Sequence, residues 1–397
     1  MNKQHITIAL GVALATHAAS LVSAQVYKIP DPLEVRDKRW IQPELPARKD
    51  YRNAYIMVPL VSTRESDNPL IVDELMVDAW GIAIRPPGKG GHWWITNTGT
   101  GTTTTYIGDA PGHPFGQDEL EVVHLPVGAL HEKNETFSQP TGMVYSGFAT
   151  TEYPVDDGKV KGSSKFIFVA LDGTIYGWTN GQEKGVKVID RGGEGRMYVG
   201  LAATEKTSGS RIYACCMNTS VVDVFDGGWK PVTLAGDFKD PAVGDGYAIF
   251  NLWWHEGKIY AAWARIANEP GDAEAYPGYG YLSVFDEEGR LIRSLQHSIQ
   301  LNAPWGLAIA PQDFGALSNH LLVGNFGDGR ILAYDLVSGA YVDTLRDQKG
   351  EPIELDGLWG LTWGNGETLG YKNHLYFAAG PEQEIQGLFG KLVPLFP

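Results

Sequence analysis

Two short stretches decide the fold, PWGLAI at residues 304–309 and LWGLTW at residues 358–363. Each places a tryptophan and a glycine at the start of an apolar run of strand length. Four related openings occur earlier in the chain: WGIAI at 80–84, TGMV at 141–144, VGLA at 199–202 and FNLW at 250–253. The openings recur about every 50 to 60 residues, which indicates an internal repeat of six units.

Further strands follow each opening. Every unit has a second apolar run, at 92–97, 166–171, 212–217, 259–263, 321–325 and 375–379. Most units add a third run that ends in an acidic turn, as in VVDVFD at 221–226. Each unit is therefore a small antiparallel meander, which cannot bury both of its faces alone. Six such units packed around an axis bury them against one another, so the sequence predicts an all-β, six-bladed β-propeller.

The ends of the repeat region predict how the ring closes. After its third strand, the last unit has room only for residues 392–397, whereas YIMVPLV at 55–61 precedes the first unit without a partner. We expect this amino-terminal strand to complete the final blade, so that residues 55–397 form a single propeller domain. A seven-bladed ring is the alternative.

The first residues are typical of an export signal. Residues 1–24 carry one early lysine, a mostly apolar stretch and a small-residue end, which predicts a secretory signal peptide and a secreted or secretory-lumen protein. Residues 25–54 are rich in proline and charge and predict an irregular arm. No later stretch is long and apolar enough to predict a membrane span.

Charge and cysteine content limit the partners. The chain has 47 acidic and 32 basic residues, a net charge of -15, which disfavours nucleic acid and anionic membrane surfaces. Asn134 and Asn218 lie in N-glycosylation sequons. The two cysteines, Cys215 and Cys216, are neighbours and predict either a strained vicinal disulfide or two buried thiols. The oligomeric state stays open.

Candidate site residues come from repeat-equivalent positions near the inner strands, because those strands line a propeller's channel and their loops converge at its mouth. The substrate-binding candidates are Trp80, Asn97, Asn218, Asn302, Trp305 and Trp359, and the catalytic candidates are Arg265, Asn325 and Asp356. Each has a structural alternative. The tryptophans would be wedges between blades, the asparagines would form turns, Arg265 would be ion-paired and Asp356 would cap a turn.

Several catalytic signatures are missing from the sequence. It contains no G-x-S-x-G elbow, no H-E-x-x-H zinc motif, no phosphate-binding GxxxxGK[ST] loop and no dinucleotide fingerprint. We therefore expect neither a cofactor nor a metal. Calcium held by oxygen ligands around the channel mouth is the alternative.

Three motifs carry a family resemblance: NAPWGLA at 302–308, GNFGDGRI at 324–331 and DGLWGL at 356–361. Through them the chain resembles a family of secreted, propeller-like proteins of bacteria and fungi, most of them functionally uncharacterised. The resemblance covers about residues 55–392. It implies export and a propeller fold, and it implies no reaction.

A narrower resemblance, to fungal hetero-Diels-Alderases of tropolone sesquiterpenoid pathways, carries no motif that can be matched residue by residue. It implies a small apolar organic substrate: the quinone methide of a tropolone, joined to a humulene-type sesquiterpene in an apolar channel without a cofactor. Such a cycloaddition requires positioning and one or two polarising donors, and a loss of water to form the methide would also require a general acid.

Two other functions compete with this one. A lactonase-like hydrolase would bind a metal through Asn97, Asn218 and Asp356. A secreted binding module without catalysis would stack its tryptophans on carbohydrate or another small molecule.

Overall fold

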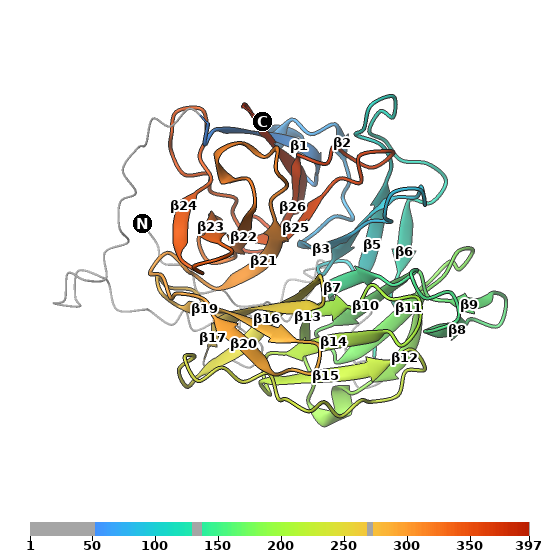
Figure 1. The fold of residues 1–397 in the computed structure, drawn as a ribbon. Helices are drawn as coiled ribbons and strands as arrows, with labels where there is room; N and C mark the ends of the chain where they lie inside the picture. The colour runs from blue at the N-terminus through green and yellow to red at the C-terminus, as the bar shows by residue number, and fades with distance from the viewer. Residues whose placement is uncertain (1–51, 129–136, 268–272, 397) are drawn as a thin grey trace, which may run out of the picture.

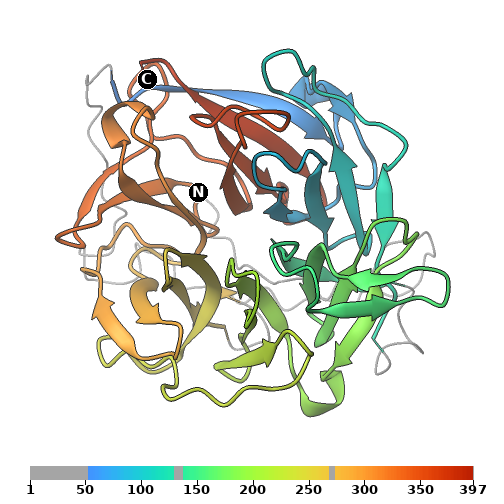
Figure 2. The same cartoon turned by 45° about the vertical axis from the view of Figure 1, so that its right-hand side comes forward.

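The computed structural model describes residues 52–128, 137–267 and 273–396. The predicted signal peptide, all but the last three residues of the predicted arm, and Asn134 lie outside the described residues. Within the described residues there is no helix of the length and apolarity that a membrane crossing requires. The six predicted units appear as six antiparallel sheets around a common axis (Figures 1 and 2).

In each of the first three blades, the strands follow one another along the chain from the innermost strand outward. Blade 1 contains β3 (Ala79–Ala83), β4 (Trp93–Asn97), β5 (Thr102–Tyr106) and β6 (Val122–His124). Blade 2 contains β7 (Pro140–Tyr145), β10 (Phe166–Ala170), β11 (Thr174–Trp178) and β12 (Val186–Asp190). Blade 3 contains β13 (Tyr198–Ala203), β14 (Arg211–Cys216) and β15 (Val221–Asp226). A separate hairpin is formed by β8 (Pro154–Asp156) and β9 (Lys161–Ser163).

The other three blades complete the ring. Blade 4 contains β16 (Tyr247–His255), β17 (Lys258–Ile266), β19 (Gly280–Asp286) and β20 (Leu291–Ser294), with β18 (Ala273–Glu274) paired to β17. Blade 5 contains β21 (Pro304–Ile309), β22 (His320–Asn325), β23 (Ile331–Asp335) and β24 (Tyr341–Thr344). Blade 6 contains β25 (Leu358–Trp363), β26 (Leu375–Ala379) and β27 (Leu388–Pro394), and its next strand is β1 (Tyr55–Ser62), followed by β2 (Ile71–Val72).

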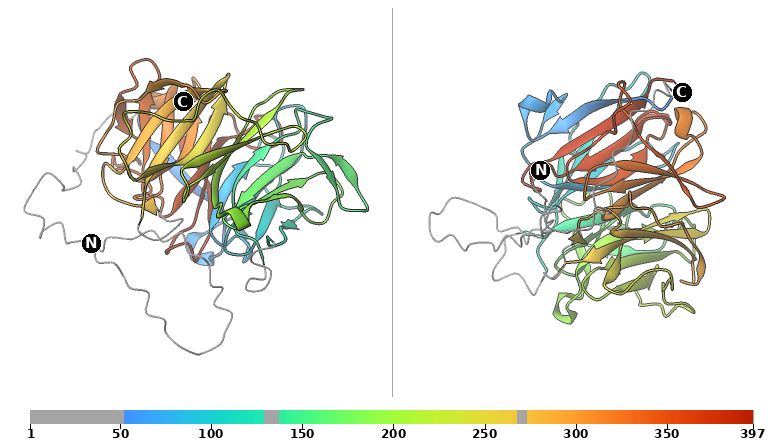
Figure 3. Two further views of the ribbon diagram at one scale, coloured as in Figure 1. Left: turned by 90° about the horizontal axis from the view of Figure 1, so that it is seen from below. Right: turned by 90° about the vertical axis from the view of Figure 1, so that its left-hand side faces the viewer.

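The predicted closure of the ring is confirmed. Strand β1 pairs antiparallel with β27 from Tyr55 opposite Pro394 to Ser62 opposite Leu388. The blue amino-terminal strand therefore lies beside the red carboxy-terminal strands (Figures 2 and 3). Six sheets account for the repeats, so the seven-bladed alternative is wrong.

The cysteines form two buried thiols, as in the second of the two predicted alternatives, and no vicinal disulfide. Cys215 and Cys216 are free and buried. They are successive residues of β14, so their side chains point to opposite faces of the sheet and join different core clusters.

Every inner strand carries an irregularity at the repeated opening motif. The register between the first and second strands of each blade shifts there, for example between Pro304 and Gly306 in blade 5 and between Tyr198 and Gly200 in blade 3. Such a bulge bends the strand and redirects a side chain. The residues at the shift in five blades are Trp80, Val199, Phe250, Trp305 and Trp359, and all of them join one central core cluster.

The glycine after the bulge sets the spacing between blades. A Cβ added at Gly360 would lie 2.6 Å from the Trp80 carbonyl oxygen, and one at Gly306 would lie 2.7 Å from the Trp359 oxygen. Equivalent close approaches occur at Gly81, Gly142 and Gly200. Neighbouring inner strands are therefore in backbone contact, which a larger residue would prevent.

This contact predicts the effect of one methyl group. Gly360→Ala should lower the free energy of unfolding by about 1–3 kcal/mol, because the new Cβ overlaps backbone that cannot move aside alone. Gly193→Ala is the matched control, since a Cβ there meets nothing within 4 Å. Urea unfolding of the two variants makes the comparison, and equal stabilities would refute this role for Gly360.

Candidate functional site

A cluster of aromatic rings fills the centre of the channel. Trp80 stacks on Trp359 with ring centroids 3.6 Å apart, and Trp305 meets both edge-on at 6.2 and 5.9 Å. Phe326 stacks on the other face of Trp359 at 3.8 Å, and Phe250 contacts its edge. We call these five residues the aromatic plug. All of them are buried, so the plug closes the channel between its two ends.

Hydrogen bonds fix the plug in place. The Trp305 indole nitrogen donates to the Val199 carbonyl oxygen at 3.0 Å, which carries the side chain from blade 5 across to blade 3. The Trp359 indole donates to Asp78 Oδ1 at 3.0 Å. The Trp80 indole nitrogen is buried without a partner among the described residues. The three tryptophans thus meet at the axis, as their shared position in the repeat predicts.

Three predicted asparagines lie at the end of the channel where the inner strands begin. Asn325 is opposite Pro304 and Asn97 is opposite Ala79, the first residues of their inner strands. The Asn325 amide donates to the Gln300 oxygen and to Asp328, and its own oxygen accepts from the Asn302 backbone. The Asn97 amide donates to two threonine hydroxyls of β5.

The remaining predicted residues belong to the same end and are held locally. The Asn218 amide nitrogen donates to the Gly195 oxygen, and its Oδ1 accepts from the Cys216 thiol. Arg265 forms an ion pair of 3.0 Å with Glu274, and its guanidinium lies 4.6 Å from the Tyr279 ring centre. Exposed Asp356 accepts a hydrogen bond from the Glu382 amide. These are the turn and ion-pair arrangements that the structural alternatives describe.

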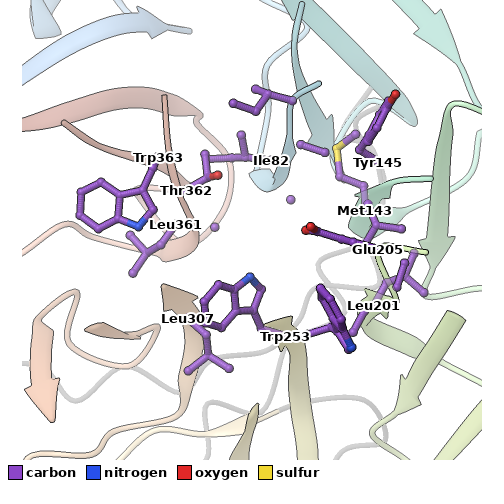
Figure 4. Close-up of a pocket in the computed structure, with 18 of the residues that line it drawn as sticks. Ile82, Met143, Tyr145, Leu201, Glu205, Trp253, Leu307, Leu361, Thr362 and Trp363 are labelled. Carbon is purple, nitrogen blue, oxygen red and sulfur yellow. The ribbon is translucent and has the colours of Figure 1, made fainter. Parts of the chain in front are cut away.

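A cavity opens on the opposite side of the plug, where the inner strands end (Figure 4). Its volume is about 520 Å³, and all six inner strands contribute to its wall. The residues directly after the repeated glycine position form the lower level: Ile82, Met143, Leu201, Leu252, Leu307 and Leu361. The residues two positions further along each chain segment form the upper level: Ile84, Tyr145, Ala203, Trp254, Ile309 and Trp363. Apolar and aromatic side chains thus form both levels of this funnel, and polar side chains complete its wall: Glu205, Asn251, Thr362, Asn365 and Lys372.

Of the nine predicted site residues, Trp305 alone lines this cavity. Trp80 and Trp359 lie in the plug beneath, and the other six lie toward the far end. Asn251, which takes the glycine position in blade 4, also lines the cavity. Its amide donates to the Trp305 carbonyl at 3.0 Å, and its buried Oδ1 has no partner among the described residues.

Glu205 is the functional candidate that the repeat pattern missed. It follows β13 by two residues, and its carboxylate projects toward the middle of the cavity between Met143 and Leu201 (Figure 4). It is the only carboxylate among the described residues of the cavity wall, and none of them bonds to it. The carboxyl is open to the cavity mouth, yet the apolar walls remove enough water to raise its pKa. A protonated carboxyl in an apolar cavity is a hydrogen-bond donor or general acid.

The described ranges contain no group of three or more His, Cys, Asp and Glu side chains arranged to hold a metal ion. The oxygen-donor set proposed from sequence combines fully buried Asn97 with exposed Asp356 and half-buried Asn218. These three residues come from three different blades and differ in depth.

Sequence comparisons place the chain near proteins of unknown activity. It is 29% identical over 344 residues to an uncharacterized protein of Acanthamoeba polyphaga mimivirus, covering 84% of this chain and 78% of that protein. A second uncharacterized mimivirus protein is 26% identical over 333 residues, with 81% of each chain covered. No family model matches the chain.

Solved structures share only remote similarity with the chain. A Bacteroides thetaiotaomicron protein of unknown function aligns with a TM-score of 0.46 at 11% identity, covering 80% of this chain and 70% of that one. A streptogramin B lyase aligns with a TM-score of 0.44 at 10% identity, covering 80% and 94%.

The plug predicts a large loss of stability when it is opened. Trp359→Ala should lower the free energy of unfolding by about 3–5 kcal/mol, because it removes a buried indole and leaves a cavity between two rings. Phe396→Ala, which changes a half-exposed aromatic residue, should cost less than about 1 kcal/mol. Chemical unfolding of both variants is the measurement, and a Trp359→Ala protein as stable as the control would show that the plug is not structural.

Buried Asp78 predicts a dependence of stability on pH. Burial raises its pKa from 3.8 to about 7, against the hydrogen bonds from Trp359 and Thr98. The unfolded chain releases this proton near pH 4, while the folded protein keeps it until about pH 7. Stability from this group is therefore lost as pH rises across that interval. Relative to wild type, Asp78→Asn should gain stability between about pH 5 and about pH 8, measured by urea unfolding; an unchanged difference would contradict the raised pKa.

Proposed function

We propose that the protein binds a small apolar organic molecule in this cavity and promotes a cofactor-free hetero-Diels-Alder cycloaddition there. The reactants would be the quinone methide of a tropolone and a humulene-type sesquiterpene. The observation that carries the proposal is the funnel itself, to whose wall all six blades contribute aliphatic or aromatic side chains. Export and membership of the family that the sequence resembles remain part of the same proposal.

The size and chemistry of the cavity support this function. A volume of about 520 Å³ falls within the roughly 300–1,000 Å³ of pockets that enclose drug-sized ligands. Apolar walls favour the transfer of hydrocarbon reactants from water, and a closed floor holds them against each other. A cycloaddition needs this positioning together with a donor that polarises an oxygen, and it needs no nucleophile.

Glu205 takes the role of that donor in the proposal, in place of Arg265, Asn325 and Asp356, which lie toward the other end of the channel. Desolvation raises the pKa of its carboxyl, which favours the protonated form relative to an ordinary glutamate. It would donate this proton to the hydroxyl group that leaves as water when the methide forms. The ring hydroxyl of the tropolone would lose its own proton in the same elimination, which restores the acid form of Glu205. Binding without catalysis is the second candidate, because the same apolar wall would suit a binding protein.

Product formation tests the reaction. Incubation with a tropolone precursor and humulene, followed by mass spectrometry, should give an adduct above the level of a control without protein. Glu205→Gln should lower the rate by about 100-fold, the usual contribution of a positioned general acid, while the thermal midpoint stays unchanged. The wild-type rate should fall as pH rises through the Glu205 pKa, because the protonated form is the active one.

Lys206→Gln is the matched control, since the neighbouring Lys206 is ion-paired with Glu287 and is absent from the cavity wall. This variant should keep the wild-type rate and pH profile. An absence of adduct, combined with ligand binding detected by tryptophan fluorescence, would replace the enzyme with a binding protein. A Glu205→Gln enzyme with full activity would remove Glu205 from the reaction.

A further inference from the structure

Basic side chains gather just outside the cavity wall between blades 1 and 2, a place that we call the rim, and neither Arg85 nor Lys165 is itself a lining residue. Arg85 follows Ile84, which lines the cavity, and Lys165 precedes β10 of the neighbouring blade. The Arg85 guanidinium lies 6.0 Å from the Phe166 ring centre, and Phe166 packs edge-on against Tyr145 of the cavity wall at 5.5 Å. The arginine is thus anchored on the aromatic residues that form this side of the rim.

These cations are poorly neutralised for a protein with a net charge of -15. Neither Arg85 nor Lys165 forms an ion pair with a carboxylate among the described residues. Arg85 donates to the neutral Asn180 Oδ1 at 2.7 Å, while its buried Nε has no acceptor. Burial, followed by the charges of Arg85 and Lys89, lowers the pKa of Lys165. The carboxylate of Glu367 approaches this loop, but it accepts its hydrogen bond from the Gly88 amide.

Like charges held together without a counter-ion are destabilising, and an anion that docks between them reverses this effect. A guanidinium with a fixed plane suits an oxyanion. Burial raises the pKa of the Tyr145 hydroxyl, and the nearby positive charge of Arg85 opposes this rise. The basic groups therefore act on the same side of the cavity that contacts an apolar ligand.

We propose that the ligand of this cavity is an amphipathic organic anion, whose apolar body occupies the funnel and whose oxyanion binds Arg85 and Lys165. This inference rests on the proposed function only in requiring that the funnel binds an apolar molecule. The oxyanion is a carboxylate, sulfonate, or aromatic or vinylogous enolate. Glu205 does not repel it while protonated, and binding of the anion raises the pKa of Glu205 further and is accompanied by proton uptake.

Two dyes that differ by one charged group test the proposal. 8-Anilinonaphthalene-1-sulfonate carries a sulfonate, N-phenyl-1-naphthylamine lacks it, and both fluoresce more strongly in an apolar cavity. We expect the sulfonate to bind wild-type protein more tightly, with a preference that declines as salt is added. Arg85→Gln and Lys165→Gln should each weaken sulfonate binding about threefold to tenfold and leave the affinity for the neutral dye unchanged.

Lys349→Gln is the control for net charge, because Lys349 is exposed in the turn after β24 of blade 5. It should change neither affinity. If Arg85→Gln fails to fold, Lys165→Gln alone decides, since the Lys165 side chain forms no hydrogen bond or ion pair with another described residue. Glu205→Gln should keep or strengthen sulfonate binding.

The outcomes separate the two proposals. Equal affinities for the two dyes, or rim variants that bind the sulfonate as tightly as wild type does, would overturn the anion site while leaving an apolar cavity. Failure of both dyes to bind would overturn the cavity function and the anion site together. Selective loss of sulfonate affinity in the rim variants supports the anion site.

Discussion

The structure depends on backbone contact between adjacent inner strands. At five of the six inner strands, a glycine faces the next blade so closely that a Cβ would overlap it, as at Gly81 against the Thr141 oxygen. In blades 1, 5 and 6 the bulge beside the glycine turns a tryptophan toward the axis. Close blades and inward-pointing tryptophans therefore have one origin, and together they give a channel that is closed in the middle and open above the plug.

Much of this architecture could be predicted from the sequence. The repeated opening motifs marked the inner strands, the second apolar runs marked their partners, and the unpaired strand at 55–61 indicated the closure of the ring. These features follow from local periodicity and from the need to bury both faces of each sheet. The contact among Trp80, Trp305 and Trp359 was also predictable, because equivalent positions in the blades lie at the same distance from the axis.

The location of the cavity was not predictable in the same way. Asn97, Asn325 and Arg265 lie at the ends of second strands, and antiparallel pairing places those ends where the inner strands begin. Which end of the channel stays open depends on how the indole rings pack, and side-chain packing leaves no periodic signal. Glu205 lies outside the repeat, and the only sign of it in the sequence is that an acidic residue stands two positions after an inner strand.

Blade 4 has Asn251 at the position where the other five inner strands have glycine, and this difference affects the chemistry of the cavity wall. Asn251 joins its blade to the next through a side-chain amide, where the other inner strands have glycine. Substitutions at the glycine positions would force whole blades apart, whereas substitutions at Asn251 would mainly alter the polarity of the cavity wall. The one contact between inner strands that can change its chemistry without moving a blade is therefore the contact between blades 4 and 5.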